Sequence, residues 1–226
     1  MYELISAGGI IMGFIIICSI IALAIICERF IALQRKKVCP KDLVPQVWKW
    51  ISDNSLDPAQ MSALRNNSPL GKVLASALLN RHLERSQMKE AIEETGRHVV
   101  IEMERFLNTL GTIATITPLL GLLGTVMGMI KVFTAITVQG VGDPTELAGG
   151  ISEALITTAG GLFVAIPSLM AVRYYQRKVD ELVTSMEQEA LKLVEVLASS
   201  RKRQRAGAPP KSTPPPPASP APGKEA

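Results

Sequence analysis

The chain has 226 residues, of which 47% are hydrophobic and only 4% aromatic, and its formal net charge is +4. The apolar residues are gathered in three blocks, residues 8–33, 107–136 and 147–172, and are not spread over amphipathic segments. Each block exceeds the roughly 20 residues that span a hydrocarbon core of about 30 Å. This distribution excludes an ordinary water-soluble domain. It predicts an all-α polytopic membrane protein with three transmembrane helices.

The first block follows a short segment, residues 1–7, in which Glu3 is the one charged residue. A signal peptide would need a basic start and a cleavage site of small residues, so we expect a retained transmembrane helix. Residues 34–106 carry twelve Lys and Arg, whereas the segment between the second and third blocks carries none after Lys131. The positive-inside rule therefore predicts a periplasmic N-terminus, a cytoplasmic 34–106 loop and a cytoplasmic C-terminus. Because this rule accounts for the net charge, we infer no nucleic-acid partner.

The 34–106 loop contains sequences typical of helices. Asp57, Pro58 and Gln60 fit the start of a helix closed by a capping box. From about Gln87 onward apolar residues recur near the helical period, and Gly96 is the only breaker. We therefore expect the second transmembrane helix to extend without interruption into a cytoplasmic helical bundle.

The third block is extended on both sides. It is preceded by a periplasmic loop, residues 137–146, in which Asp143 and Glu146 fit another capping box. Residues 173–200 keep an apolar stripe, which predicts a cytoplasmic helix that packs in the same bundle. Residues 201–226 are basic and then rich in Pro, Ala and Ser, a composition that predicts a disordered tail.

The third block contains a single charge, Glu153. A carboxylate in lipid is expensive, and such residues usually face a bundle interior or a wet cavity and often mark a proton or ion path. The alternative is a protonated Glu153 that hydrogen-bonds to a neighbouring helix. Thr157 lies four residues later on nearly the same helix face, and Thr158 is rotated away from it.

The second block carries small and hydroxyl-bearing residues along one face, at Thr117, Gly121, Thr125 and Gly128, and Gly124 widens this stripe. Small residues let membrane helices approach closely, and Thr can hydrogen-bond between them. The stripe is therefore explained either by helix packing or by a pore lined with hydroxyls.

Three further residues interrupt the apolar pattern of these blocks. Pro118 and Pro167 remove backbone hydrogen bonds and are expected to kink their helices. Lys131 lies near the outer end of the second block and is expected to extend its ammonium to the membrane interface. Pairing with the carboxylate of a partner is the alternative.

Other chemistries fit the sequence poorly. The stretch "GLLGTVMG" lacks the Gly-Lys-Ser/Thr ending and the preceding strand of a phosphate-binding loop. His82 and His98 lie in the 34–106 loop without the spacing of metal ligands. We expect no metal, no cofactor and no enzymatic activity.

Three stretches together resemble the ExbB branch of the MotA/TolQ/ExbB proton-channel family: "ALAIICERFIAL", "LGTIATITPLLGLLGTVMGMIKVF" and "GGISEALITTAGGLFVAIPSLMAVRYY". The resemblance covers about residues 8–200, and the order and spacing of the last two stretches are its specific part. It implies an inner-membrane subunit that forms a homopentamer around single-span ExbD-like subunits. Proton flow through this complex would drive a TonB-like protein and hence transport across the outer membrane.

The resemblance also implies roles for individual residues. Glu153 corresponds to the pore carboxylate of the family, and Thr125 and Thr158 correspond to its pore hydroxyls. The Asp that accepts the proton belongs to the ExbD-like partner. Two alternatives remain: a TolQ-like or paralogous subunit that serves envelope integrity or another export system, and a membrane scaffold that conducts nothing.

Overall fold

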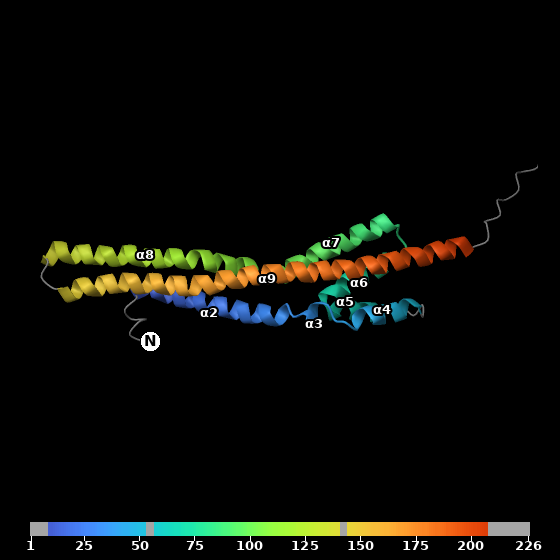
Figure 1. Ribbon diagram of the computed structural model, residues 1–226, viewed down its shortest axis with the longest axis horizontal. Helices are drawn as coiled ribbons and strands as arrows, with labels where there is room; N and C mark the ends of the chain where they lie inside the picture. The colour runs from blue at the N-terminus through green and yellow to red at the C-terminus, as the bar shows by residue number, and fades with distance from the viewer. Residues whose placement is uncertain (1–8, 53–56, 141–143, 208–226) are drawn as a thin grey trace, which may run out of the picture.

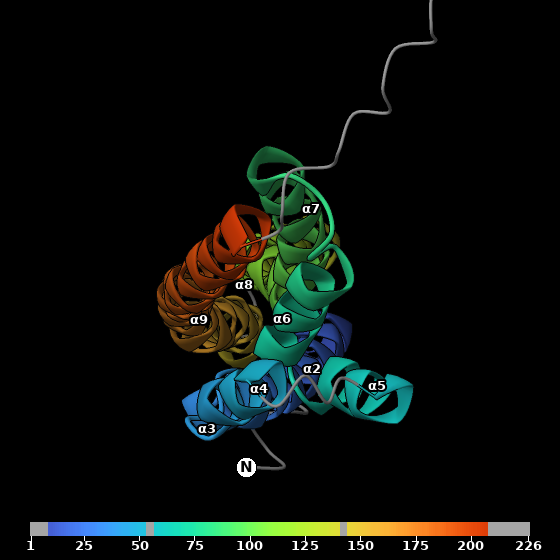
Figure 2. The same ribbon diagram turned by 90° about the vertical axis from the view of Figure 1, so that its right-hand side faces the viewer.

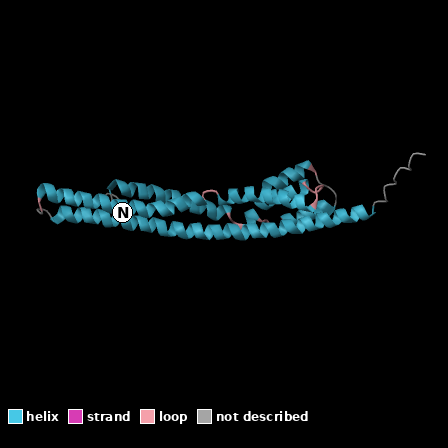
Figure 3. Ribbon diagram, turned by 90° about the horizontal axis from the view of Figure 1, so that it is seen from above, coloured by secondary structure: helices cyan, strands magenta, loops and turns pink. Residues whose placement is uncertain are grey.

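The computed structural model describes residues 9–52, 57–140 and 144–207, and every regular element in these ranges is an α-helix (Figures 1 and 3). The helices are α2 Gly9–Ala32, α3 Arg35–Val38, α4 Leu43–Ser52, α5 Pro58–Asn67, α6 Pro69–Leu79, α7 Arg85–Glu104, α8 Leu107–Gln139 and α9 Pro144–Gly207. Three spans are long and apolar enough to cross a membrane, at Gly9–Ala32, at Leu107–Thr137 and within Leu147–Leu197. The predicted all-α polytopic membrane protein is confirmed.

The membrane part consists of a hairpin of α8 and the first half of α9, with α2 packed against both (Figure 1). Many large apolar side chains of these helices are exposed, among them Ile10, Leu119 and Phe163. Such surfaces are unfavourable in water but suit a hydrocarbon environment, in which helices satisfy their own backbone hydrogen bonds. We call α8 and residues 144–172 of α9 the membrane hairpin.

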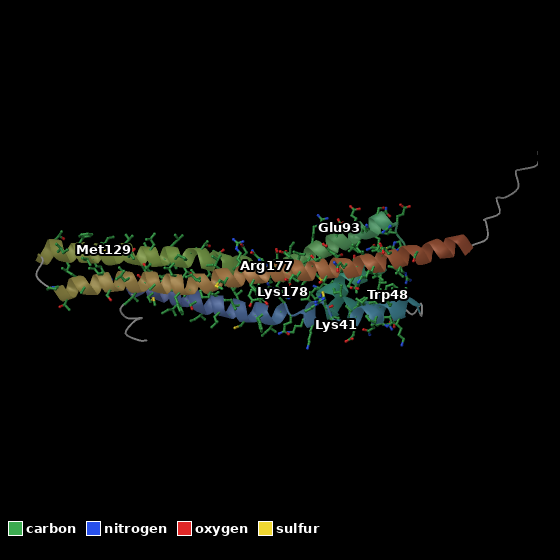
Figure 4. The ribbon with its side chains drawn as sticks, in the orientation of Figure 1. Lys41, Trp48, Glu93, Met129, Arg177 and Lys178 are labelled. Carbon is green, nitrogen blue, oxygen red and sulfur yellow. The ribbon has the colours of Figure 1, made fainter. Side chains whose placement is uncertain are left out.

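The second half of α9 belongs to a bundle with α3 to α7. In this bundle α6 lies at the centre and contacts α3, α5, α7 and α9 (Figure 2). The bundle core is formed chiefly by buried side chains of α6 and α9, such as Leu70, Leu74, Leu78, Val179, Leu182, Met186 and Val194. Figure 4 shows its charged surface, on which Lys41, Glu93 and Arg177 are labelled, whereas Met129 lies on the membrane hairpin.

The expected continuous helix from Gln87 into the membrane is wrong, because the chain breaks between α7 and α8. At the break Phe106 adopts a left-handed conformation with φ 66°, the one positive φ of a non-glycine residue in the described chain. Such a conformation costs a side-chain-bearing residue about 1–2 kcal/mol, so neighbouring contacts must hold it. No Gly or Pro marks this position, which is why the sequence pattern did not indicate it.

Arg29 of α2 supplies the contacts that hold the break. Its side chain is 5% exposed, and its Nη1 donates to the carbonyl oxygen of Met103 at 2.9 Å, near the end of α7. The guanidinium lies 5.5 Å from the ring centroid of Phe106, and Glu28 pairs with its other nitrogens. A helix end without a partner for its carbonyls would be costly, so Arg29 acts as the cap that α7 lacks.

Several predicted boundaries differ from the observed ones. α9 continues to Gly207 beyond the predicted end at 200, because no breaker precedes the Pro-rich segment. α5 starts at Pro58 as expected, but Asp57 makes no side-chain cap and the predicted capping box does not form. α8 continues to Gln139, so the loop before Pro144 is shorter than 137–146. The predictions for residues 1–7, Asp143 and most of the tail fall outside the described residues.

Replacing Arg29 by Met should destabilise the joint between α7 and α8. The substitution keeps most of the side-chain volume but leaves the Met103 carbonyl without its donor and Glu28 without its partner. We expect a loss of about 1.5–3 kcal/mol, the value of a hydrogen bond to a charged group. The measurement is thermal unfolding of the purified protein in detergent micelles. Arg81→Met, at an exposed side chain, is the control and should leave the midpoint unchanged.

Candidate functional site

The carboxylate predicted from the sequence lies inside the apolar span of α9 and is paired with a lysine of α8. Glu153 lies six residues beyond the start of that span at Leu147, which is about 9 Å at 1.5 Å per residue. The Nζ of Lys131 donates to both of its oxygens, at 2.7 Å to Oε1 and 2.8 Å to Oε2. Lys131 therefore pairs with a carboxylate of its own chain, and its expected extension to the membrane interface stays a prediction.

This ion pair explains how a charged residue can be tolerated in the apolar span. An isolated carboxylate in hydrocarbon loses its hydration, and a contacting ammonium offsets part of that cost. The two partners are exposed to different degrees, since the side chain of Glu153 is 20% exposed and that of Lys131 is 58% exposed. Lys131 is thus the more accessible partner of the pair, and Glu153 is the more enclosed one.

The start of α2 lies against the same carboxylate, a contact that sequence reasoning missed. Gly9 has φ +61°, and a Cβ at this position would overlap Oε1 of Glu153 and lie 3.9 Å from Nζ of Lys131. The backbone conformation therefore favours glycine here, whereas the Glu153 carboxylate could shift to make room for a Cβ. The helix end at Gly9 also presents the positive end of the α2 dipole to Glu153. Three helices thus meet at this acid.

The three predicted pathway threonines occupy different environments. Thr158 lies one helical turn beyond Ala154 in α9, and its hydroxyl donates across the hairpin to the carbonyl of Gly121 at 3.1 Å. Thr125 is half-buried in α8, and its hydroxyl donates to Leu122 O at 2.6 Å. Both hydroxyl groups donate their proton to a backbone carbonyl. The lone pairs of the two hydroxyl oxygens can therefore accept hydrogen bonds from water.

Thr157 differs from the other two. Its side chain is 1% exposed, and its hydroxyl donates to the carbonyl oxygens of Glu153 and Ala154 at 3.0 and 2.9 Å. It fills the contact between α8 and α9, so the structure places it in helix packing and not at an accessible surface. The helical spacing put Thr157 on the face of Glu153, but spacing alone could not show which part of that face is covered by α8.

The glycines of the second block lie where α8 approaches α9. A Cβ at Gly121 would lie 3.0 Å from Thr158 Cα, and one at Gly124 would overlap the side chain of Thr157. At Gly128 it would lie 2.8 Å from the carbonyl oxygen of Gly150. The contact is therefore backbone against backbone, as small residues in membrane helices allow.

Two glycines of α9 belong to this contact although the sequence reasoning did not single them out. A Cβ at Gly161 would lie 2.8 Å from Thr117 O, and one at Gly150 would overlap Val132. Their spacing from Glu153 in the sequence could have indicated that they belong to the contact with α8. Pro118 and Pro167 lie inside α8 and α9, and both helices continue through them. The predicted kinks stay a prediction.

The described residues do not bring three His, Cys, Asp or Glu side chains together in a way that could hold a metal ion. The membrane hairpin carries the pair of Glu153 and Lys131, and a second charged pair, Glu28 and Arg29, lies near the end of the α2 span.

Comparison with known proteins links this site to a family. The family model described as the MotA/TolQ/ExbB proton channel family matches residues 65–188. A Synechocystis protein named ExbB-like 1 is 33% identical over 169 residues, which cover 74% of this chain and 66% of the relative. An ExbB homolog of Methanothermobacter thermautotrophicus is 30% identical over 189 residues, 82% of this chain and 66% of the relative.

A third relative, the biopolymer transport protein ExbB of Neisseria gonorrhoeae, is 33% identical over 138 residues, 54% of this chain and 62% of its own length. This chain therefore matches slightly less than two thirds of each of these three relatives. The matched family region, residues 65–188, includes both partners of the ion pair and the glycine contact between α8 and α9.

A double-mutant cycle tests whether the ion pair stabilises the membrane hairpin. Lys131→Met leaves Glu153 unpaired, and Glu153→Gln leaves Lys131 unpaired, so each change alone should lower the unfolding midpoint in detergent. The double variant should lose less stability than the sum of the two single losses. The coupling free energy should be about 0.5–1 kcal/mol, a small value because half-exposed Lys131 is partly screened. Additive losses would contradict the pairing. Lys131→Arg keeps the charge and should retain the coupling.

The glycine contact predicts that the same substitution, Gly to Ala, has different effects on stability at two positions of α8. Gly124→Ala forces a methyl group into Thr157 and should destabilise the hairpin by about 1–3 kcal/mol, the usual cost of overpacking. Gly111→Ala is the matched control, since nothing lies within 4 Å of its added Cβ. It should leave the midpoint unchanged or raise it slightly, because Ala favours a helix over Gly. Equal effects of the two substitutions would contradict the close contact at Gly124.

Proposed function

The chain belongs to the MotA/TolQ/ExbB proton channel family, and from this membership we propose that it is an inner-membrane channel subunit that couples proton flow to TonB-dependent transport across the outer membrane. The observation that carries the proposal is Glu153, an ionisable acid inside an apolar span with an exposed counter-ion. A purely structural acid would be expected to be buried with its partner, whereas here the partner is half-exposed.

Glu153 acts in the proposed pathway by exchanging its counter-ion for a proton. In the resting state its carboxylate is paired with Lys131. A proton that arrives on the carboxylate neutralises it and releases the ammonium, and transfer of that proton to an acidic residue of a partner restores the pair. Thr125 and Thr158 accept hydrogen bonds from water along the way, since their own protons are bound to carbonyls.

One copy of the chain does not enclose such a pathway. The membrane hairpin packs its two helices in direct backbone contact, and Glu153 lies at its surface. Leu122 and Phe133 of α8 and Phe163 of α9 also expose apolar surface. A passage would form between copies, which supports a homo-oligomer, a pentamer by family resemblance. Its centre would hold an ExbD-like single-span subunit, and the complex would drive a TonB-like protein.

The orientation in this proposal follows from the basic residues of the bundle. Arg35, Lys36 and Lys37 come directly after α2, and Arg173 and Arg177 come where α9 leaves its apolar span. The positive-inside rule places these residues, and with them the bundle and the C-terminus, in the cytoplasm. The pair of Glu153 and Lys131 then lies in the periplasmic half of the membrane.

Complementation of a deletion strain tests the proposal. Uptake of iron bound to a siderophore is measured in a strain that lacks this gene and its paralogues, with wild type or Glu153→Gln restored at equal membrane level. We expect wild type to restore uptake and Glu153→Gln to remain at the level of the deletion strain, at least tenfold lower. Gln keeps the size of the side chain but cannot exchange a proton at pH 7. Glu187→Gln, in the exposed part of the bundle, is the control and should restore uptake.

Other outcomes favour the alternatives. If uptake survives deletion but the cells leak periplasmic proteins, the chain serves envelope integrity as a TolQ-like subunit. If deletion abolishes uptake and Glu153→Gln restores it fully, the chain supports its partners as a scaffold that conducts nothing.

A further inference from the structure

A second site lies at the other end of the membrane part, where α2 ends. There a cavity of about 170 Å³ opens between the end of α2, the start of α3 and α9. Phe30, Leu33 and Tyr174 contribute apolar walls, and Arg35 and Lys178 contribute cations. We infer that this cavity binds the phosphate headgroup of an anionic phospholipid. The inference goes beyond the proposed function and does not depend on it.

The cavity lies at the boundary of the apolar layer. The membrane span of α2 ends at Ala32, and the hydroxyl of Tyr175 ties α9 to α2 at this level by donating to Ile26 O at 2.8 Å. Phe30 and Tyr174 are 64% and 59% exposed, although both are large aromatic side chains. Aromatic residues concentrate at the membrane–water interface, where their rings lie at the level of the headgroups. The mouth of the cavity is therefore where lipid phosphates are found.

The charges around the cavity favour an anion. No Asp or Glu lines it, and among the described residues Arg35 forms no ion pair. Lys178 contacts Glu181 at 3.2 Å, but that carboxylate is 60% exposed and lies one turn along the same helix, so the pair is weak. Arg29 also borders the cavity, but its guanidinium is occupied by Glu28 and Met103 O. Two cations from different helices remain available.

The apolar walls indicate why the anion belongs to a lipid and not to a soluble phosphate. Phe30 continues the exposed apolar face of α2, which includes Leu23 and Ile31. A headgroup bound between Arg35 and Lys178 would place its acyl chains along this face. Basic pockets between membrane helices at the cytoplasmic side are a known mode of lipid headgroup recognition. Figure 4 shows Lys178 at this junction between the membrane part and the bundle.

Lipid titration of the full-length protein, followed by native mass spectrometry, tests the inference. The protein is purified in detergent and titrated with phosphatidylglycerol, phosphatidylcholine or glycerol phosphate. We expect phosphatidylglycerol to bind at least tenfold more tightly than either of the others. In the variant Arg35→Gln/Lys178→Gln its affinity should fall about 10- to 30-fold, since each surface cation contributes about a factor of five. Arg35→Lys/Lys178→Arg keeps both charges and should retain binding.

The control removes the same number of charges from the neighbouring positions. Lys36→Gln/Arg177→Gln changes residues that do not line the cavity, and it should leave the affinity within about twofold of wild type. Unfolding midpoints without lipid confirm that all variants are folded. An equal loss in the control would overturn the site, because it would indicate diffuse attraction to a basic surface. Equally tight binding of glycerol phosphate, or of phosphatidylcholine, would overturn the assignment to an anionic lipid.

Discussion

The structure depends on one constraint: a charge inside an apolar layer needs a partner at contact distance. Glu153 meets this constraint through Lys131, and the pair requires that α8 and α9 run antiparallel in one register. A rotation or shift of either helix by one turn, about 5.4 Å, would separate the ammonium from the carboxylate. The position of this acid and the geometry of the membrane hairpin therefore depend on each other. The start of α2 at Gly9 lies against the same ion pair and is the third helix at this site.

The glycines of the membrane hairpin fix the register between α8 and α9. Gly121, Gly124 and Gly128 let α8 approach the backbone of α9 so closely that side chains at these positions would collide with it. In such a contact each small residue faces a particular partner, since displacement would bring larger neighbours into the same space. The alternatives left open by the sequence, helix packing or a hydroxyl lining, are thus not exclusive. The glycines and Thr157 form the packing face, and Thr125 and Thr158 keep oxygen atoms available beside it.

The sequence predicted the elements whose signals are local and missed those that depend on the relative placement of helices. Hydropathy was sufficient for the three membrane spans, and the positions of Pro58 and Pro144 marked two helix starts. The break at Phe106 was missed because its cause, Arg29, lies in another helix. The pairing of Lys131 with Glu153 was recoverable, since the two lie almost equally far from the turn of the hairpin. It required the assumption that the hairpin is straight and tightly packed.

The two connections between membrane and bundle differ in a way that bears on coupling. α9 is continuous over 64 residues, about 96 Å, and joins the membrane hairpin to the bundle core without a break. The path through α8 is interrupted at Phe106, and there the bundle is attached through Arg29 of α2. Under the proposed function, release of the ion pair at one end of the hairpin would reach the bundle along α9, while the Arg29 cap keeps α2 and α7 connected. The membrane part is thus joined to the bundle by one continuous helix and by one jointed connection, so the two can respond differently to a change within the membrane.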